Sequence, residues 1–116
     1  MNTITTFKQI KEIIEPIPAN RFCVDEYQNG EGQCCFLGHI QKDISGSPFA
    51  EGDGFGASGL TRRFLKEVHN IDKDGASVNN DNCVNGYTEP IIKDRLMHMI
   101  EDGIKWEVNK TSLEEG

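Results

Sequence analysis

The sequence lacks any apolar run of about 18 residues, the shortest length usual for a membrane-spanning helix, so we predict no membrane association. Residues 1–15 contain no basic segment followed by an apolar block, and we therefore expect no secretory signal and a cytoplasmic protein. The four cysteines are then expected to be reduced thiols, because the cytoplasm keeps thiols reduced. We therefore predict neither a membrane-embedded fold nor a fold stabilised by disulfide bonds.

A basic surface is also missing. The chain has 12 Lys and Arg residues against 19 Asp and Glu residues, which gives a net charge of −7. Because nucleic-acid binding needs a basic face, we predict no nucleic-acid partner. The acidic residues are spread along the chain, which also disfavours a mimic of DNA. A chain of 116 residues is typical of one domain, and we predict a globular domain at 1–108 and a flexible C-terminal tail at 109–116.

The residue pattern predicts a mostly helical α+β fold with about four short helices, one small β-hairpin and two long polar loops. The helices are expected at 5–15, 34–44 and 60–70, and from a cap at Thr88 to an end at Gly103. The hairpin would use the apolar run at 22–24 and the turn at 28–32, and the loops are 45–59 and 72–86. Residues expected to face the core include Leu60, Phe64, Leu65, Val68, Ile71, Ile92, Leu96, Met99, Ile100, Trp106 and Val108.

Two blocks resemble those of a group of small uncharacterised bacterial and phage proteins. The first is GEGQCCFLGHI at 30–40, which resembles that group's D-G-x-x-C-A-L-G-A-L block. The second is VNNDNCVNGYTEPIIKDRLMHMIEDGI at 78–104, where an Asn-Asn or Asn-Asp pair precedes a Thr-capped helix that ends near D-x-I. The matching positions are Asn79, Asn80, Thr88, Arg95, Leu96, Asp102 and Ile104. The resemblance implies a phage or mobile-element origin and brings no assigned activity.

A cysteine nucleophile is one chemical interpretation of the first block. Gln28 precedes Cys34 by six residues, which resembles the spacing in papain-like hydrolases, where the glutamine donates to an oxyanion and the cysteine opens a helix. A helix N-terminus favours the thiolate, His69 would be the base, and Asn79 or Asn80 would orient it. The alternative is that Cys34 and Cys35 are small apolar residues that pack a turn against a helix.

Two metal sites are weaker interpretations. Cys35 and His39 lie four residues apart, a workable pair of zinc ligands that Cys23 and Cys83 would complete, but no C-x-x-C or H-x-x-x-H pair is present. The alternative is that His39 bonds a backbone carbonyl. The segment starting at Asp72 begins like a calcium loop, then lacks the required ligands and glycine, because Ala76, Ser77 and Cys83 stand at those positions. We therefore predict no metal and no cofactor.

The glycine-rich segment GDGFGASG at 52–59 suggests a site for a small anionic ligand. It leads into a helix start and is followed at once by Arg62 and Arg63. Free N–H groups at a helix N-terminus, flexible glycines and two guanidinium groups are suited to a phosphate. The expected ligand-binding residues are Gly56, Ser58, Gly59, Arg62 and Arg63. The alternative is a loop followed by arginines on a solvated helix face.

Taken together, these features predict a small, soluble, non-catalytic binding protein. A phage-type accessory or counter-defence factor that binds a host protein or a small phosphorylated ligand fits the resemblance and the two long loops. The alternative function is a thiol-dependent hydrolase that uses Cys34 and His69, with Gln28 and Asn80 in supporting roles. The sequence leaves the oligomeric state open.

Overall fold

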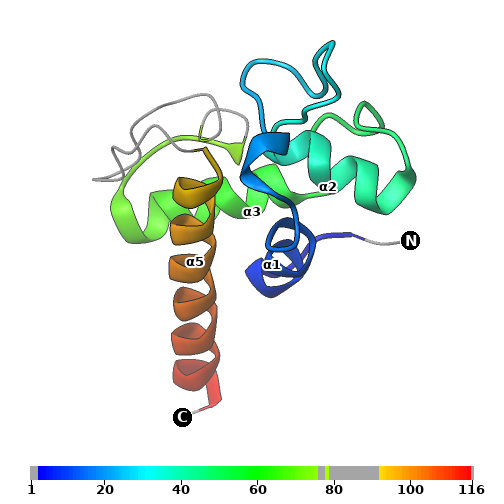
Figure 1. Cartoon of the computed structure of the whole chain (residues 1–116). Coiled ribbons are helices and arrows are strands. Elements are labelled where there is room, and N and C mark those ends of the chain that lie inside the picture. The colour runs from blue at the N-terminus through cyan, green and yellow to red at the C-terminus, as the bar shows by residue number, and fades with distance from the viewer. Residues whose placement is uncertain (1–2, 76–77, 79–91, 116) are drawn as a thin grey trace.

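Helices make up most of the described chain. The computed structural model describes residues 3–75, residue 78 and residues 92–115, with the backbone alone for 111–115. In chain order the elements are α1 (Phe7–Ile14), the 3₁₀ turn η1 (Ala19–Arg21), α2 (Phe36–Ser45), α3 (Ala57–Phe64), the π-helical turn η2 (Leu65–His69) and α5 (Ile92–Glu115). Figure 1 shows α1 between α5 and α2. The prediction of a mostly helical fold is confirmed.

Local sequence signals explain where the first helices begin and end. Thr6 caps α1, because its side chain accepts from the Gln9 amide while the Gln9 side chain bonds back to the cap backbone. At α2 the Cys35 sulfur takes the capping role, accepting from the Gly38 amide at 3.4 Å. Gly46 ends α2 in the left-handed conformation, which glycine adopts without strain.

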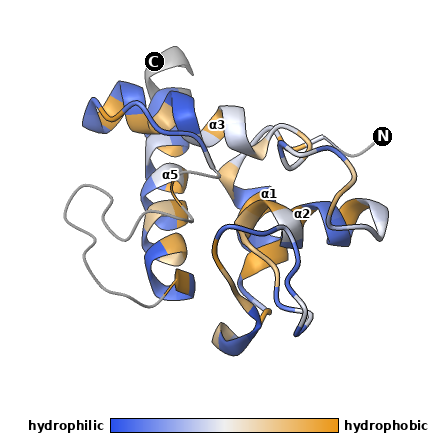
Figure 2. Cartoon of the chain, turned by 90° about the horizontal axis from the view of Figure 1, so that it is seen from above, coloured by the Kyte–Doolittle hydropathy of each residue, from blue (hydrophilic) through white to orange (hydrophobic). Residues whose placement is uncertain are grey.

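The core forms where α1, α2, α3 and α5 meet. Figure 2 shows hydrophobic positions along α1 and α5, and residues of both helices belong to the core. Three phenylalanines, Phe7, Phe36 and Phe64, are among the largest fully buried side chains, and the Phe7 and Phe64 rings pack edge to face at 5.2 Å. Further core residues, most of them expected from the helical spacing, include Ile10, Ile14, Leu37, Ile40, Leu60, Leu65, Leu96, Met99 and Ile100. No helix in the described ranges is both long and apolar enough to cross a membrane.

Helix α5 does not end at Gly103, and this prediction is wrong. The helix continues to Glu115, so residues 109–115, expected as a tail, form its last turns. Gly103 serves a different purpose: a β-carbon there would lie 2.5 Å from the Phe7 ring. Glycine therefore allows α1 to approach α5 closely. The contact is extended by Glu107, whose two carboxylate oxygens accept from the Phe7 amide at 2.8 and 2.9 Å.

The predicted β-hairpin is absent from the residues that the structure describes. Only isolated bridges join Phe22 to Cys34 and Gln28 to Cys34. A ladder needs several successive pairs, but Asp25 has a φ of 68° and the chain enters α2 directly after Cys34. Side chains hold this segment instead: the Asn29 carboxamide oxygen accepts from two amides of its own turn.

Residues 46–56 form a loop, as predicted, but α2 includes Ser45 and α3 begins at Ala57, so the loop is shorter than the predicted 45–59. The protein holds this loop with buried polar contacts. The Gln41 side chain is fully buried; its amide nitrogen donates to the Pro48 carbonyl and its oxygen accepts from the Gly54 amide at 2.8 Å. The Tyr27 hydroxyl donates to the Gly52 carbonyl at 2.8 Å. A buried glutamine with both ends satisfied ties the loop to α2.

Candidate functional site

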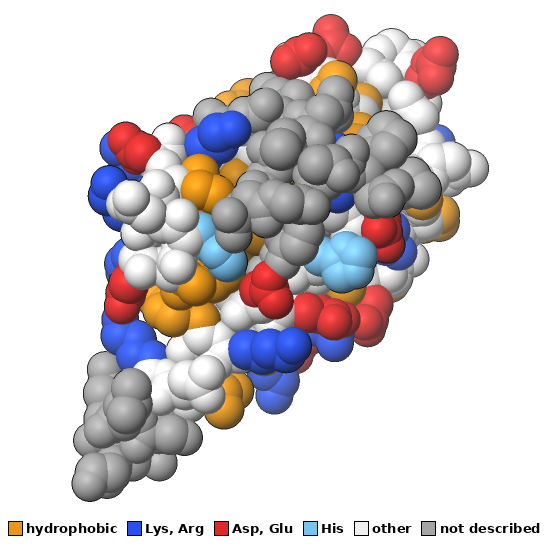
Figure 3. Space-filling model, turned by 90° about the vertical axis from the view of Figure 1, so that its left-hand side faces the viewer, with side chains coloured by type: hydrophobic (Ala, Val, Ile, Leu, Met, Phe, Trp, Pro, Cys, Tyr) orange, Lys and Arg blue, Asp and Glu red, His pale blue; other side chains and the backbone are white. Residues whose placement is uncertain are grey.

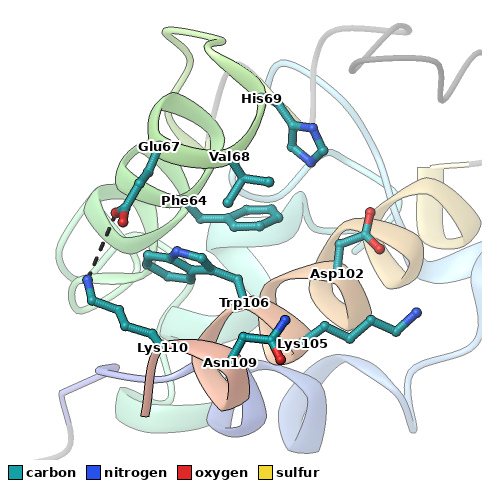
Figure 4. Close-up of a pocket in the computed structure, with 9 residues that line it drawn as sticks. All are labelled: Phe64, Glu67, Val68, His69, Asp102, Lys105, Trp106, Asn109 and Lys110. Atoms are coloured by element: carbon teal, nitrogen blue, oxygen red, sulfur yellow. Dashed lines mark ion pairs between the residues drawn. The ribbon is translucent and has the colours of Figure 1, made fainter. Parts of the chain in front are cut away.

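A groove of about 410 Å³ lies between η2 and the C-terminal half of α5, and we call it the η2–α5 groove. In Figure 4 the rings of Phe64 and Trp106 form its floor, with Val68 above Phe64. Polar and charged side chains surround this floor. The full lining is Phe64, Glu67, Val68, His69, Asp102, Lys105, Trp106, Asn109 and Lys110.

The π-helical turn explains why Val68 opens onto this groove. The 3.6-residue period of an α-helix predicts that Val68 faces the core with Leu65, but Val68 is 47% exposed whereas Leu65 is buried. In a π-helical turn each residue advances by a smaller angle, so the apolar face shifts. Asn70 then ends the turn in the left-handed conformation, and its amide donates to the Leu65 carbonyl. The prediction that Val68 packs inward is wrong for this reason.

Trp106 is the other main apolar surface of the groove and the only tryptophan of the chain. Its ring centre lies 5.5 Å from that of Phe64, and the Lys110 ammonium sits 5.1 Å above the indole. Lys110 also pairs with Glu67 at 3.9 Å, while His69 packs edge-on against Phe64 at 5.5 Å. Figure 3, which views this side of the molecule, shows hydrophobic side chains open between charged ones.

The structure does not bring the candidate nucleophile and base together. Cys34 is fully buried beside Phe22 and Gln28 at the start of α2, whereas His69 lies in the η2–α5 groove. Burial raises the pKa of the Cys34 thiol, although Lys42 and Arg21 act in the opposite direction. A nucleophile needs exposure and a lowered pKa, so this geometry does not support thiol catalysis. Asn80 lies outside the described residues.

We expect the described cysteines to resist alkylation in the folded protein. Cys23, Cys34 and Cys35 are buried, and burial raises the pKa of each thiol. Peptide mapping after brief iodoacetamide treatment at neutral pH should show little labelling at these three sites, and full labelling in urea. Rapid labelling of Cys34 in the native protein would contradict its burial and revive the hydrolase hypothesis.

The zinc candidates are engaged in other contacts. The Cys35 sulfur accepts from the Gly38 amide, and His39 Nε2 donates to the Arg21 carbonyl at 2.8 Å. The alternative interpretation of His39 is therefore confirmed, and burial lowers the pKa of this imidazole. Cys83 and the calcium-loop positions Ala76 and Ser77 lie outside the described residues. Within the described ranges, no group of three or more metal-binding side chains comes together.

The glycine loop satisfies its own amides. The Gly54 and Phe55 amides donate to the Gln41 and Asp53 side-chain oxygens, respectively. At the start of α3, the Ala57 amide donates to Gly54 and the Ser58 amide donates to Asp53. These contacts occupy four N–H groups that a phosphate would otherwise use.

The other residues expected to bind the anion are dispersed. Gly56 is the cap residue of α3, Ser58 is buried with its hydroxyl accepting from the Gly75 amide at 3.1 Å, and Gly59 faces open space. Arg62 and Arg63 lie in the last turn of α3, away from its start, and Arg62 pairs with Asp72 at 2.9 Å. The structure does not assemble these five residues into one site.

The sequence analysis missed the η2–α5 groove as a site. Trp106 packs against the core, as predicted, but Val68 and Val108, which were also expected there, are 47% and 59% exposed. The groove joins segments that are far apart in the chain, so no local motif marks it. The single tryptophan near a solvent-facing helix end is the one sequence signal that pointed toward it.

Comparison with protein-family models, curated proteins and solved structures finds no match to this chain. The resemblance of the 30–40 and 78–104 blocks to small bacterial and phage proteins therefore stays a prediction.

Proposed function

We propose that this protein is a non-catalytic binding protein that takes an apolar side chain of a partner protein into the η2–α5 groove. The observation that supports this most directly is the open apolar surface of Val68 and Trp106, which lies over the buried ring of Phe64. An aromatic floor inside a polar rim is typical of the central pocket of a protein–protein interface. The phage-type accessory role predicted from the resemblance is compatible with such a pocket.

The charges of the rim favour a protein segment over a phosphorylated ligand. Glu67 pairs with Lys110, and Asp102 and Lys105 contribute one charge of each sign. Such a mixed rim matches the polar groups that flank an apolar side chain in a peptide, and it provides no cluster of cations for a phosphate. The net charge of −7 would favour the approach of a basic partner.

Val68→Asp is expected to weaken this binding strongly while the fold is retained. Because Val68 is 47% exposed, aspartate is tolerated in the free protein but places a charge against the apolar occupant. Peptides that bind the native protein can first be selected from a displayed library. These peptides should bind the variant at least about tenfold more weakly than they bind the native protein. Binding can be followed by the fluorescence of Trp106, the single tryptophan in the groove.

Val108→Asp is the matched control, because Val108 is 59% exposed on α5 and does not line the groove. It introduces the same charge at an exposed apolar position. The selected peptides should bind this variant as they bind the native protein, and both variants should unfold near the native temperature. Equal losses in the two variants, or selected peptides insensitive to Val68→Asp, would place the binding surface elsewhere.

A further inference from the structure

A second concavity gathers cations on another side of the molecule. A hollow of about 460 Å³ lies between α1, the segment around η1 and α2, and we call it the Arg21–Lys42 hollow. Arg21, His39 and Lys42 line it together with apolar residues that include Ile13 and Ile17. Neither Arg21 nor Lys42 forms an ion pair with another residue in the described ranges. In a chain with a net charge of −7, these two cations have no carboxylate partner among the described residues.

Two hydrogen bonds fix the position of Arg21 in this hollow. His39 Nε2 donates to the Arg21 carbonyl at 2.8 Å, and the Phe22 ring covers the imidazole at 4.5 Å between ring centres. The Arg21 guanidinium donates through Nη2 to the Gly32 carbonyl at 2.9 Å. One guanidinium nitrogen is thus used by the loop, and the remaining donors of the fork stay available for a ligand.

The positive charges of Arg21 and Lys42 both influence the pKa of His39 and of Cys34. Desolvation by burial is the main reason that the pKa of His39 is lowered, and both Lys42 and Arg21 lower it further. The same pair opposes the burial-driven rise in the pKa of the Cys34 thiol. Arg21, His39 and Lys42 all line the hollow, so an anion bound there would be stabilised by both positive charges.

Two carboxylates also line the hollow. Glu12 and Asp43 line the Arg21–Lys42 hollow, but they also line an adjoining concavity that includes Thr3 and Gln9. Arg21, His39 and Lys42 do not line that adjoining concavity. Among the described residues, neither carboxylate forms an ion pair with Arg21 or Lys42, whereas Lys110 of the η2–α5 groove is paired with Glu67.

We propose that the Arg21–Lys42 hollow binds a small organic anion, with its carboxylate or phosphate group between Arg21 and Lys42 and its apolar part against Ile13 and Ile17. A guanidinium and an ammonium form strong charge-assisted hydrogen bonds with such groups. The volume is in the range that holds a small organic molecule. This is the class of ligand predicted for the glycine loop, whose amides are already engaged. The proposal is independent of the η2–α5 groove.

The test is an NMR titration of the full chain with phenyl phosphate, and with benzoate in a second arm to separate phosphate from carboxylate recognition. At millimolar probe, at least one of the two should shift the resonances of residues around His39 and Lys42, and benzyl alcohol, which lacks the charge, should not. Lys42→Gln should weaken binding about tenfold, because it removes a charge-assisted contact. Lys42→Gln is preferred to an Arg21 variant, since the Arg21 side chain also holds the Gly32 carbonyl.

Lys66→Gln is the matched control, because it makes the same change in net charge at an exposed position on η2 outside the hollow. It should leave the affinity unchanged. Equal weakening by Lys66→Gln and Lys42→Gln would overturn the proposal in favour of non-specific attraction. Absence of any shift around His39 and Lys42 with both anions would also overturn it, without bearing on the function proposed for the groove.

Discussion

Gly38→Ala is expected to lower the free energy of unfolding by about 3 kcal/mol, because it forces a methyl group into backbone that cannot move away. A β-carbon at Gly38 would overlap the Tyr27 carbonyl oxygen and lie 3.0 Å from the Tyr27 carbonyl carbon. Tyr27 is held by its hydrogen bond to Gly52 and by its edge contact with Phe49. Urea unfolding followed by circular dichroism measures the loss.

Gly59→Ala is the control for helix propensity. Gly59 lies in α3, as Gly38 lies in α2, and nothing stands within 4 Å of a β-carbon built on it. Alanine should therefore stabilise the protein by up to about 1 kcal/mol at this position. A Gly38→Ala variant that gained stability in the same way would show that α2 does not approach the Tyr27 backbone as closely as described.

Gly103→Ala is the second substitution with a large expected effect, a loss of about 2 kcal/mol after the gain in helix propensity is included. The added β-carbon would lie 2.5 Å from two atoms of the Phe7 ring. That ring is fully buried and packs against Phe64 at 5.2 Å and Trp106 at 6.4 Å, so it has little room to rotate. Thermal unfolding measures the change, and Trp106 fluorescence reports whether the aromatic cluster is displaced.

Phe7→Leu provides the test of the mechanism. If the clash with the ring is the cause, Gly103→Ala should cost less in a Phe7→Leu background than in the native protein, since the smaller side chain leaves space for the methyl group. The difference is a coupling energy between two residues in contact. Equal costs in both backgrounds would show that Gly103 acts through the backbone of α5 alone.

Helical spacing predicted the buried faces of α1, α2 and α5, because the apolar residues there repeat with the ordinary 3.6-residue period. It failed at Val68, where the helix changes to a π-helical turn that no local pattern marks. It also failed at Gly103, since a glycine can end a helix or admit a close neighbour, and the choice here depends on Phe7. The hairpin prediction rested on a short apolar run followed by a turn. The same pattern is compatible with the isolated bridges at Cys34 that the structure has instead of a hairpin.

The candidate site was less predictable than the fold. The η2–α5 groove needs the relative placement of η2 and α5, which comes from packing rather than from adjacent residues. The glycine-rich sequence at 52–59 suggested free backbone amides. Two of these amides donate to side-chain oxygens of Gln41 and Asp53, and the sequence alone does not reveal these contacts. Conversely, the second hollow joins Arg21 and Lys42 from two elements that no motif links.

The hydrogen bond from the Phe7 amide to the Glu107 carboxylate joins residues 100 positions apart, so it forms only after nearly the whole described chain has been synthesised. Helix α1 is made first and packs most extensively on α5, the last helix of the described chain to be made. A nascent chain that has emerged only through α3 lacks Leu96, Met99 and Ile100, so the apolar face of α1 is left without its main cover. We therefore expect the core to close late, once most of α5 has left the exit tunnel, at a rate limited by bringing distant segments together.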